Sequence, residues 1–225
     1  TVVLPETVAR EKLEKIKALG VETILHSNDS GIAEQHAQKL AKEQGKIYVS
    51  PYNDPQIIAG QGTLAIELLD QLPRLDVVYV SIGGGGLISG IGSVIKAFSP
   101  QTRVVGVSAK NSAELAASIR AGKMVKVGHH ETLADGCAGG VDGDTITLGL
   151  GTEVIDDLID CSEEQIEAGL QKIAWSEKML VEGSAGLAYA AWEEDARNNE
   201  NKISAVVLCG ANFYKETLAP IFNSQ

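Results

Sequence analysis

An apolar run followed by four glycines occupies residues 76–90, which read Asp76-Val77-Val78-Tyr79-Val80-Ser81-Ile82-Gly83-Gly84-Gly85-Gly86-Leu87-Ile88-Ser89-Gly90. The run from Asp76 to Ile82 is nearly continuous in apolar residues rather than alternating, which is typical of a strand buried on both faces of a parallel sheet. Beyond the glycines, apolar residues recur at the spacing of a core-facing helix: Leu87, Ile91, Val94 and Phe98. The segment therefore predicts a strand, a tight turn and a helix.

The four glycines indicate an anion site. Without side chains, the backbone N–H groups can approach an anion closely, and the following helix adds its positive N-terminal end. A tight turn without a ligand is the alternative, although one or two glycines suffice for a turn. The dinucleotide pattern Gly-x-Gly-x-x-Gly fails here by one residue, because its third glycine falls on Ile88 or Ser89, and no Gly-Lys-Ser/Thr triplet is present. A smaller phosphorylated cofactor fits the loop better.

Strands and helices are predicted to alternate along the chain. Strands are expected at 2–4, 21–25, 47–49, 76–82, 103–107, 158–161 and 204–208, with helices between most of them. This order predicts an α/β fold with an open, mostly parallel sheet and helices on both faces. The turn-rich joint 51–55 predicts a boundary between residues 1–50 and 51–225, while 122–151 gives only a weak signal.

Composition excludes several classes of protein. The 225 residues are 44% hydrophobic and carry a net charge of −11 without a basic cluster, so a nucleic-acid partner is not expected. No apolar run approaches the roughly 20 residues of a membrane span, so no membrane partner is expected. Three cysteines without metal-ligand spacing favour a reduced, cytoplasmic protein.

Three further places carry polar or reactive side chains. Cys209 follows a predicted strand, where ligands of open α/β sheets bind, although a buried, inert cysteine is the alternative; Cys137 and Cys161 are interpreted as inert. Glu182 is either a residue that starts a helix or a site residue. The pair at 129–130, two histidines, is expected in a solvated loop.

Five segments, in order, resemble the motifs of the threonine dehydratase and serine racemase family, which are pyridoxal-phosphate enzymes of the tryptophan-synthase β type. The resemblance covers essentially the whole chain. The segments are Asp54-Pro55-Gln56-Ile57-Ile58-Ala59-Gly60-Gln61-Gly62-Thr63, Ser81 to Gly90, Thr132-Leu133-Ala134-Asp135-Gly136, Val181-Glu182-Gly183-Ser184-Ala185-Gly186 and Leu208-Cys209-Gly210-Ala211-Asn212.

The resemblance implies fold type II and a set of cofactor-binding residues. Cys209 would face the pyridine nitrogen, and Gly136 and Glu182 would lie near the ring. Backbone N–H groups of the loop would hold the cofactor phosphate: Gly83, Gly84, Gly85, Gly86 and Leu87.

The chain also departs from the family pattern. Ser108 stands where cation-binding relatives have Glu, so no metal site with Ser112 and Glu114 is expected. The Schiff-base lysine of the family lies in an N-terminal segment without a counterpart in this sequence, and we expect no catalytic residue among those present. Residues 1–50 would then be a remnant of the smaller domain, and 51–225 the large cofactor-binding domain.

The activity implied by the resemblance is an ammonia-lyase reaction that converts threonine, serine or a similar hydroxy amino acid to a 2-oxo acid and ammonia. The enzyme would be a homodimer or homotetramer, and this chain alone would be inactive. Two alternatives stay open: a serine-type racemase using the same site, and a non-catalytic phosphate-binding fragment.

Overall fold

A computed structural model describes residues 1–8, 10–213 and 215–223. The chain divides into two compact units, Thr1–Ser50 and Pro51–Gln225. Within the described residues, none of the helices combines the length and apolar character that crossing a bilayer requires.

The first unit is a small parallel βαβα arrangement. It contains β1 (Val2–Leu4), α1 (Arg10–Ala18), β2 (Thr23–Leu25) and α2 (Ser30–Gln44), and the two strands pair in parallel. Helix α2 begins where the side chain of Asp29 accepts the Ile32 N–H, and it ends at Gly45, which has a left-handed φ of 62°.

The strand predicted at 47–49 is not formed. Ile47 is 92% exposed and Val49 is 60% exposed, and neither belongs to a strand in the described structure. Apolar and β-branched side chains favour extended backbone, but a strand also requires a neighbouring strand to take up its N–H and C=O groups.

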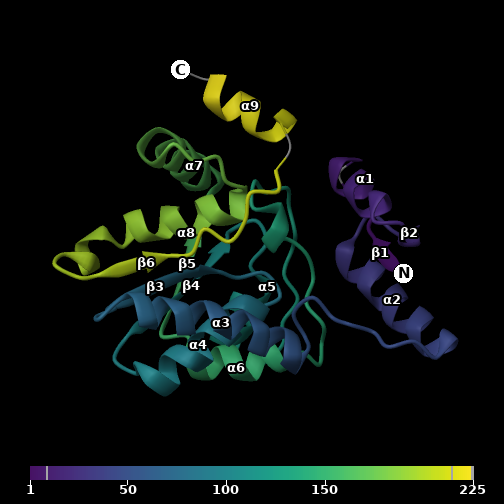
Figure 1. The fold of residues 1–225 in the computed structure, drawn as a ribbon, viewed down its shortest axis with the longest axis horizontal. Coiled ribbons are helices and arrows are strands. Elements are labelled where there is room, and N and C mark those ends of the chain that lie inside the picture. The colour runs from purple at the N-terminus through teal and green to yellow at the C-terminus, as the bar shows by residue number, and fades with distance from the viewer. Residues whose placement is uncertain (9, 214, 224–225) are drawn as a thin grey trace. The chain divides into compact units, whose positions relative to one another are not determined.

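The second unit is built on a four-stranded parallel sheet in the order β5-β4-β3-β6. Helices cover both faces: α3, α4 and α6 lie on one side of the sheet, and α7 and α8 on the other (Figure 1). The predicted α/β fold class is thereby confirmed. The elements are α3 (Pro55–Gln71), β3 (Val77–Ser81), α4 (Gly86–Phe98), β4 (Arg103–Ala109), α5 (Glu114–Ala121), α6 (Ile146–Val154), β5 (Asp157–Cys161), α7 (Glu163–Glu177), α8 (Gly183–Glu194), β6 (Ser204–Val206) and α9 (Lys215–Asn223).

Strand β3 lies at the centre of the core. Alternate side chains enter two different clusters: Val77 and Tyr79 pack with α7 and α8, whereas Val78 and Val80 pack with α3 and α4. All four are fully buried. The near-continuous apolar run at 77–82 therefore reflects a strand covered on both faces.

Two details of the helices differ from the sequence prediction. In α4 the buried stripe is Ile88, Ile91 and Ile95, whereas Phe98, expected to face the core, is 76% exposed. The stripe is shifted because the face of α4 that is buried is the one against which α3, α6 and strand β3 pack. Helix α6 was not predicted, because its glycines and threonines have low helix propensity and tertiary packing overrides them.

Candidate functional site

The polar and glycine-rich segments converge at the carboxyl edge of the sheet. Strands β4 and β5 are added to the sheet on one side of β3, and β6 is added on the other side of β3. The strand order reverses between β3 and β6, which is the position where open parallel sheets bind ligands. The four-glycine loop follows β3, and Cys209 follows β6.

Two carbonyl groups of the glycine loop accept hydrogen bonds from other residues, whereas the N–H groups of the loop are left available as donors. The hydroxyl of Thr147 donates to the Gly84 carbonyl at 2.7 Å, and the Ser89 N–H donates to the Gly85 carbonyl at 3.0 Å. In the part of the chain that the structure describes, no intramolecular hydrogen bond is donated by the N–H groups from Gly83 to Leu87. These donors lie at the positive end of α4, so the loop can bind an anion.

The loop is also packed too closely for side chains. A Cβ added to Gly84 would lie 2.3 Å from Cγ of Tyr52, and Gly85 has a φ of 87°, which disfavours other residues. Packing therefore requires at least two of the four glycines, beside any role in anion binding.

Cys137 joins the glycine loop to the next segment. A Cβ on Gly83 would lie 3.0 Å from Cα of Cys137, which ends a 3₁₀ turn, Asp135–Cys137. Burial raises the pKa of the Cys137 thiol to about 12, and the charge of Glu182 contributes to the same direction. The thiol is thus neutral and unreactive, as the sequence interpretation expected, but it lies among the candidate site residues.

The start of α8 lies against the same 3₁₀ turn. A Cβ on Gly136 would be 3.0 Å from Oγ of Ser184 and 3.3 Å from Oε1 of Glu182. The Ser184 hydroxyl is buried without a nitrogen or oxygen partner in the described residues, and it lies beside the Cys137 thiol. Ser81, at the end of β3, donates to the Ser184 carbonyl at 2.6 Å and holds the first turn of α8 against the sheet.

Glu182 connects α8 to the segment after β6. It is the N-cap residue of α8; its carboxylate accepts the Asn212 N–H at 2.9 Å, and its own N–H donates to the Gly210 carbonyl at 3.1 Å. A Cβ on Gly210 would lie 2.6 Å from the Glu182 carboxyl carbon. Glu182 therefore starts a helix, as one of its two interpretations expected, and it lies among the candidate site residues.

Cys209 is exposed, so the buried position that was the alternative interpretation is not observed. Desolvation by its surroundings nevertheless raises the pKa of its thiol to about 11, and the negative charge of Glu182 is the second cause. A neutral thiol therefore stands at the carboxyl end of β6 at physiological pH.

The sequence-predicted residues form one contiguous group. Gly83 contacts the 3₁₀ turn of Gly136, Gly136 contacts Glu182, and Glu182 contacts the Cys209–Gly210 segment. Leu87, the second residue of α4, is half-buried above the loop. Sequence reasoning missed Tyr52 and Thr147, because nothing in their local pattern distinguishes them from other turn and helix residues. It also did not single out Ser184, although this residue lies inside the quoted motif from Val181 to Gly186.

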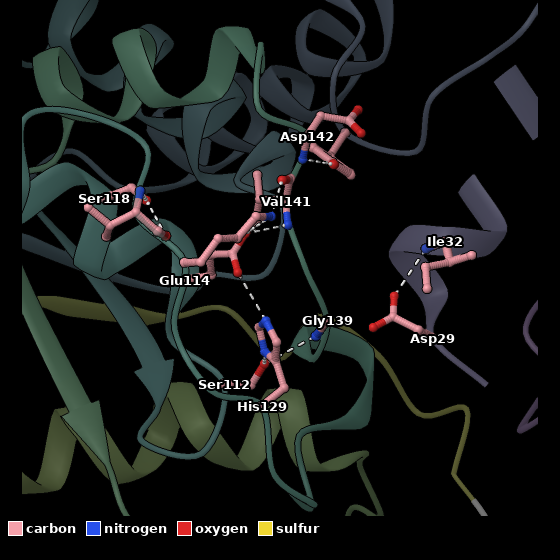
Figure 2. A network of polar contacts seen from close by, with 12 residues as sticks. Asp29, Ile32, Ser112, Glu114, Ser118, His129, Gly139, Val141 and Asp142 are labelled. Atoms are coloured by element: carbon pink, nitrogen blue, oxygen red, sulfur yellow. Dashed lines mark hydrogen bonds and ion pairs between the residues drawn. The ribbon is translucent and has the colours of Figure 1, made fainter. Parts of the chain in front are cut away.

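A second polar group lies beside this one. The buried carboxylate of Glu114 accepts hydrogen bonds from His129 at 3.0 Å, from Lys126 at 2.9 Å and from the Val141 N–H at 3.0 Å (Figure 2). The other ring nitrogen of His129 lies 2.8 Å from the Ser112 hydroxyl. His129 lies in an exposed loop, as expected, and its ring also takes part in this network.

The two oxygens of Glu114 are thus engaged by protein donors. Burial of the carboxylate opposes its charge, but the donors at Val141, Lys126 and His129 together outweigh burial and hold the pKa of Glu114 below its usual value. Within the described ranges, no group of three or more His, Cys, Asp or Glu side chains is placed to hold a metal ion.

Comparison with known proteins identifies the family. The sequence profile described as "Pyridoxal-phosphate dependent enzyme" matches residues 1–210. The chain belongs to the pyridoxal-phosphate dependent enzyme family. Its cofactor is therefore pyridoxal phosphate.

Curated relatives include two enzymes that are named for threonine. L-threonine ammonia-lyase of Thermotoga maritima is 34% identical over 99% of this chain and 55% of its own length. The biosynthetic L-threonine dehydratase of Haemophilus influenzae is 33% identical over 96% of this chain and 42% of its own. The chain thus spans about half the length of these relatives.

Solved structures agree on the fold. The processed form of threonine deaminase isoform 2 from Solanum lycopersicum has a TM-score of 0.87 at 28% identity, over 97% of this chain and 64% of that one. Maize serine racemase has a TM-score of 0.85 at 27% identity, over 97% of this chain and 68% of that one. The fold is therefore that of type II pyridoxal-phosphate enzymes.

The residues present fit the family cofactor. The N–H groups from Gly83 to Leu87, which stand at a helix N-terminus, suit its phosphate. A neutral thiol is compatible with an uncharged pyridine nitrogen. Nothing in the donor set conflicts with binding.

Proposed function

We propose that this chain is the cofactor-binding part of an ammonia-lyase that converts threonine or serine to a 2-oxo acid and ammonia. The names of the relatives, an ammonia-lyase, dehydratases and a deaminase, support the reaction class. Unit Pro51–Gln225 would be the large cofactor-binding domain, and unit Thr1–Ser50 the remnant of the smaller domain.

One observation carries the proposal. The N–H groups from Gly83 to Leu87 have no intramolecular acceptor in the described structure, and they stand at a helix N-terminus where the strand order reverses. We propose that Gly83, Gly84, Gly85, Gly86 and Leu87 bind the cofactor phosphate through these groups.

The other site residues would surround the ring. Gly136 and Glu182 would lie beside it, and Cys209 would face the pyridine nitrogen. When bound, the cofactor supplies an electron sink for negative charge at the substrate Cα. A neutral Cys209 would leave the ring nitrogen unprotonated, which limits that sink and favours elimination.

The base and the covalent anchor would come from elsewhere in a longer polypeptide. Most lysines of the first unit lie on α1 and α2, where Lys17 and Lys39 pair with glutamates on the same exposed helix faces. Lys46 follows α2, and its ammonium group donates to the Thr1 hydroxyl at 3.3 Å. We therefore propose that this chain binds the cofactor weakly and does not turn over amino acids alone.

A racemase using the same site is the second candidate. Serine racemases of maize and Dictyostelium discoideum are both structural relatives, with TM-scores of 0.85 and 0.82. A product assay in the longer enzyme separates the two, because the lyase forms a 2-oxo acid and ammonia whereas the racemase forms the mirror-image amino acid.

A non-catalytic phosphate-binding fragment is the third candidate. Turnover that is restored when a lysine-bearing segment is supplied would favour the enzyme, whereas continued absence of turnover would favour the fragment. The homo-oligomeric state and the cytoplasmic location stay predictions.

The proposal is tested by titrating ¹⁵N-labelled chain with inorganic phosphate and with pyridoxal phosphate. We expect the largest amide shifts at Gly83 to Leu87, and shifts near Gly136 and Cys209 with pyridoxal phosphate only. Shifts confined to other regions would overturn the phosphate site. Borohydride reduction followed by mass spectrometry tests whether this chain alone turns over amino acids. A stoichiometric cofactor adduct on one lysine, together with 2-oxo acid formed from threonine, would show that the chain is catalytic.

A further inference from the structure

Tyr52 lies directly against the glycine loop. It is 8% exposed, and its ring occupies the space beside Gly84, where an added Cβ would be 2.3 Å from Cγ. Its backbone lies against the first residue of α4, because a Cβ on Gly86 would be 2.9 Å from Cα of Tyr52. Tyr52 therefore contacts the loop at two alternate glycines.

The other end of Tyr52 contacts a different segment. Its hydroxyl oxygen accepts the Asp142 N–H at 2.8 Å. Residues 139–142, which we call the anchored segment, are held independently: the Gly139 N–H donates to the Ser112 hydroxyl at 3.1 Å, and the Val141 N–H donates to Glu114 at 3.0 Å (Figure 2).

A loop of four glycines needs support from outside. Each glycine loses more conformational freedom on ordering than any other residue, so the loop cannot hold its N–H groups in place by itself. Thr147 restrains the Gly84 carbonyl, and Tyr52 supplies a flat surface under the same residue. A binding site whose donors are already in place loses less entropy when an anion binds.

We propose that Tyr52 is a positioning residue for phosphate binding, which joins the glycine loop to the anchored segment and thereby fixes the orientation of the loop N–H groups. The inference rests on the proposed function, since that function assigns the phosphate to this loop. Tyr52 itself would not touch the cofactor.

The test compares Tyr52→Phe with Tyr189→Phe. The first change keeps the ring under Gly84 and removes only the oxygen that accepts the Asp142 N–H. The second is a matched control in α8, where Tyr189 packs against Trp192 with ring centroids 5.3 Å apart. Phosphate affinity is measured from the amide shifts of Gly83 to Leu87, and hydrogen exchange of the same amides is measured without ligand.

We expect Tyr52→Phe to weaken phosphate binding about three- to tenfold, the effect of one lost hydrogen bond, and to speed exchange at Gly84 and Gly86. Tyr189→Phe should leave both unchanged. The double variant Tyr52→Phe with Ser112→Ala should be non-additive in phosphate affinity, because both changes release the same segment.

Equal phosphate affinity and equal loop exchange in Tyr52→Phe and the parent chain would overturn the positioning role. Additive effects in the double variant would overturn the link through the anchored segment. If the parent chain binds no phosphate at the loop, the proposed function fails, and hydrogen exchange in the absence of ligand still decides whether Tyr52 orders the loop.

Discussion

The carboxylate of Glu182 accepts a 2.9 Å hydrogen bond from the backbone N–H of Asn212, so the first turn of α8 meets the segment that follows β6 at one charged group. The Glu182 N–H returns a bond to the Gly210 carbonyl at 3.1 Å. This pairing places a negative charge beside the Cys209 thiol and makes the acidity of that thiol depend on Glu182.

We expect Glu182→Gln to lower the pKa of Cys209 from about 11 toward its ordinary value of 9.0. The pKa should stay above 9.0, because desolvation is the larger cause and the substitution leaves it in place. The neutral amide can still accept the Asn212 N–H. Since the thiolate is the reactive form, the alkylation rate of Cys209 by iodoacetamide at mildly alkaline pH should rise.

Cys209→Ser supplies the background rate in the same assay. The remaining thiols, Cys137 and Cys161, have pKa values raised to about 12 by burial and should react little. An alkylation profile for Glu182→Gln that superimposes on the parent profile would show that Glu182 does not influence the thiol.

The network around Glu114 predicts an acid-dependent loss of stability. The folded-state pKa of Glu114 lies below the ordinary value of 4.5, so its stabilising effect is complete above that pH and is lost as pH falls through the folded-state pKa. Glu114→Gln should lower the free energy of unfolding at neutral pH by about 1–3 kcal/mol and make its decline in acid shallower. Urea unfolding at a series of pH values measures both.

Glu153→Gln is the matched control, because Glu153 is exposed on α6. It should leave the free energy of unfolding at neutral pH nearly unchanged. If Glu114→Gln keeps the parent dependence on pH, the Glu114 network does not cause the acid sensitivity.

Gly84→Ala should destabilise the fold by about 1–3 kcal/mol, since the new Cβ would lie 2.3 Å from the Tyr52 ring. Gly149→Ala is a contrasting change in α6, where no atom lies within 4 Å of the added Cβ. That substitution should stabilise the helix by about 0.5–1 kcal/mol. Thermal unfolding of both variants checks the pair, and equal midpoints would contradict the packing seen at Gly84.

Tyr79→Phe should lower the free energy of unfolding by about 1–2 kcal/mol. The buried Tyr79 hydroxyl donates toward Asp195 at 2.6 Å and Asn199 at 2.9 Å, and it accepts from Arg103. Tyr189→Phe again serves as the comparison. If urea unfolding gives the same loss in the free energy of unfolding for both variants, the hydrogen bonds of the Tyr79 hydroxyl do not stabilise the fold beyond an ordinary tyrosine hydroxyl.

Local pattern was sufficient for most of the elements. The Ser162-x-x-Gln165 pattern is typical of a capping box at the start of a helix, and both of its hydrogen bonds are present at the start of α7. The apolar run at 77–82 predicted a buried strand, and the family resemblance agrees with the profile that matches residues 1–210. By contrast, α6 and the missing strand at 47–49 depend on partners far along the chain, which no local window contains.

Residue type and short-range spacing were enough to predict the alternation of strands and helices, the family, and the glycine loop between β3 and α4, because each of these depends on residues that lie close together in the chain. Tertiary structure alone decided that Tyr52 lies under Gly84, that Cys137 lies against Gly83 and Ser184 against Gly136, and that His129 binds Glu114. Each of these contacts joins residues that are well separated in the chain. Their distances depend on how helices pack against the sheet rather than on the residues next to them in sequence.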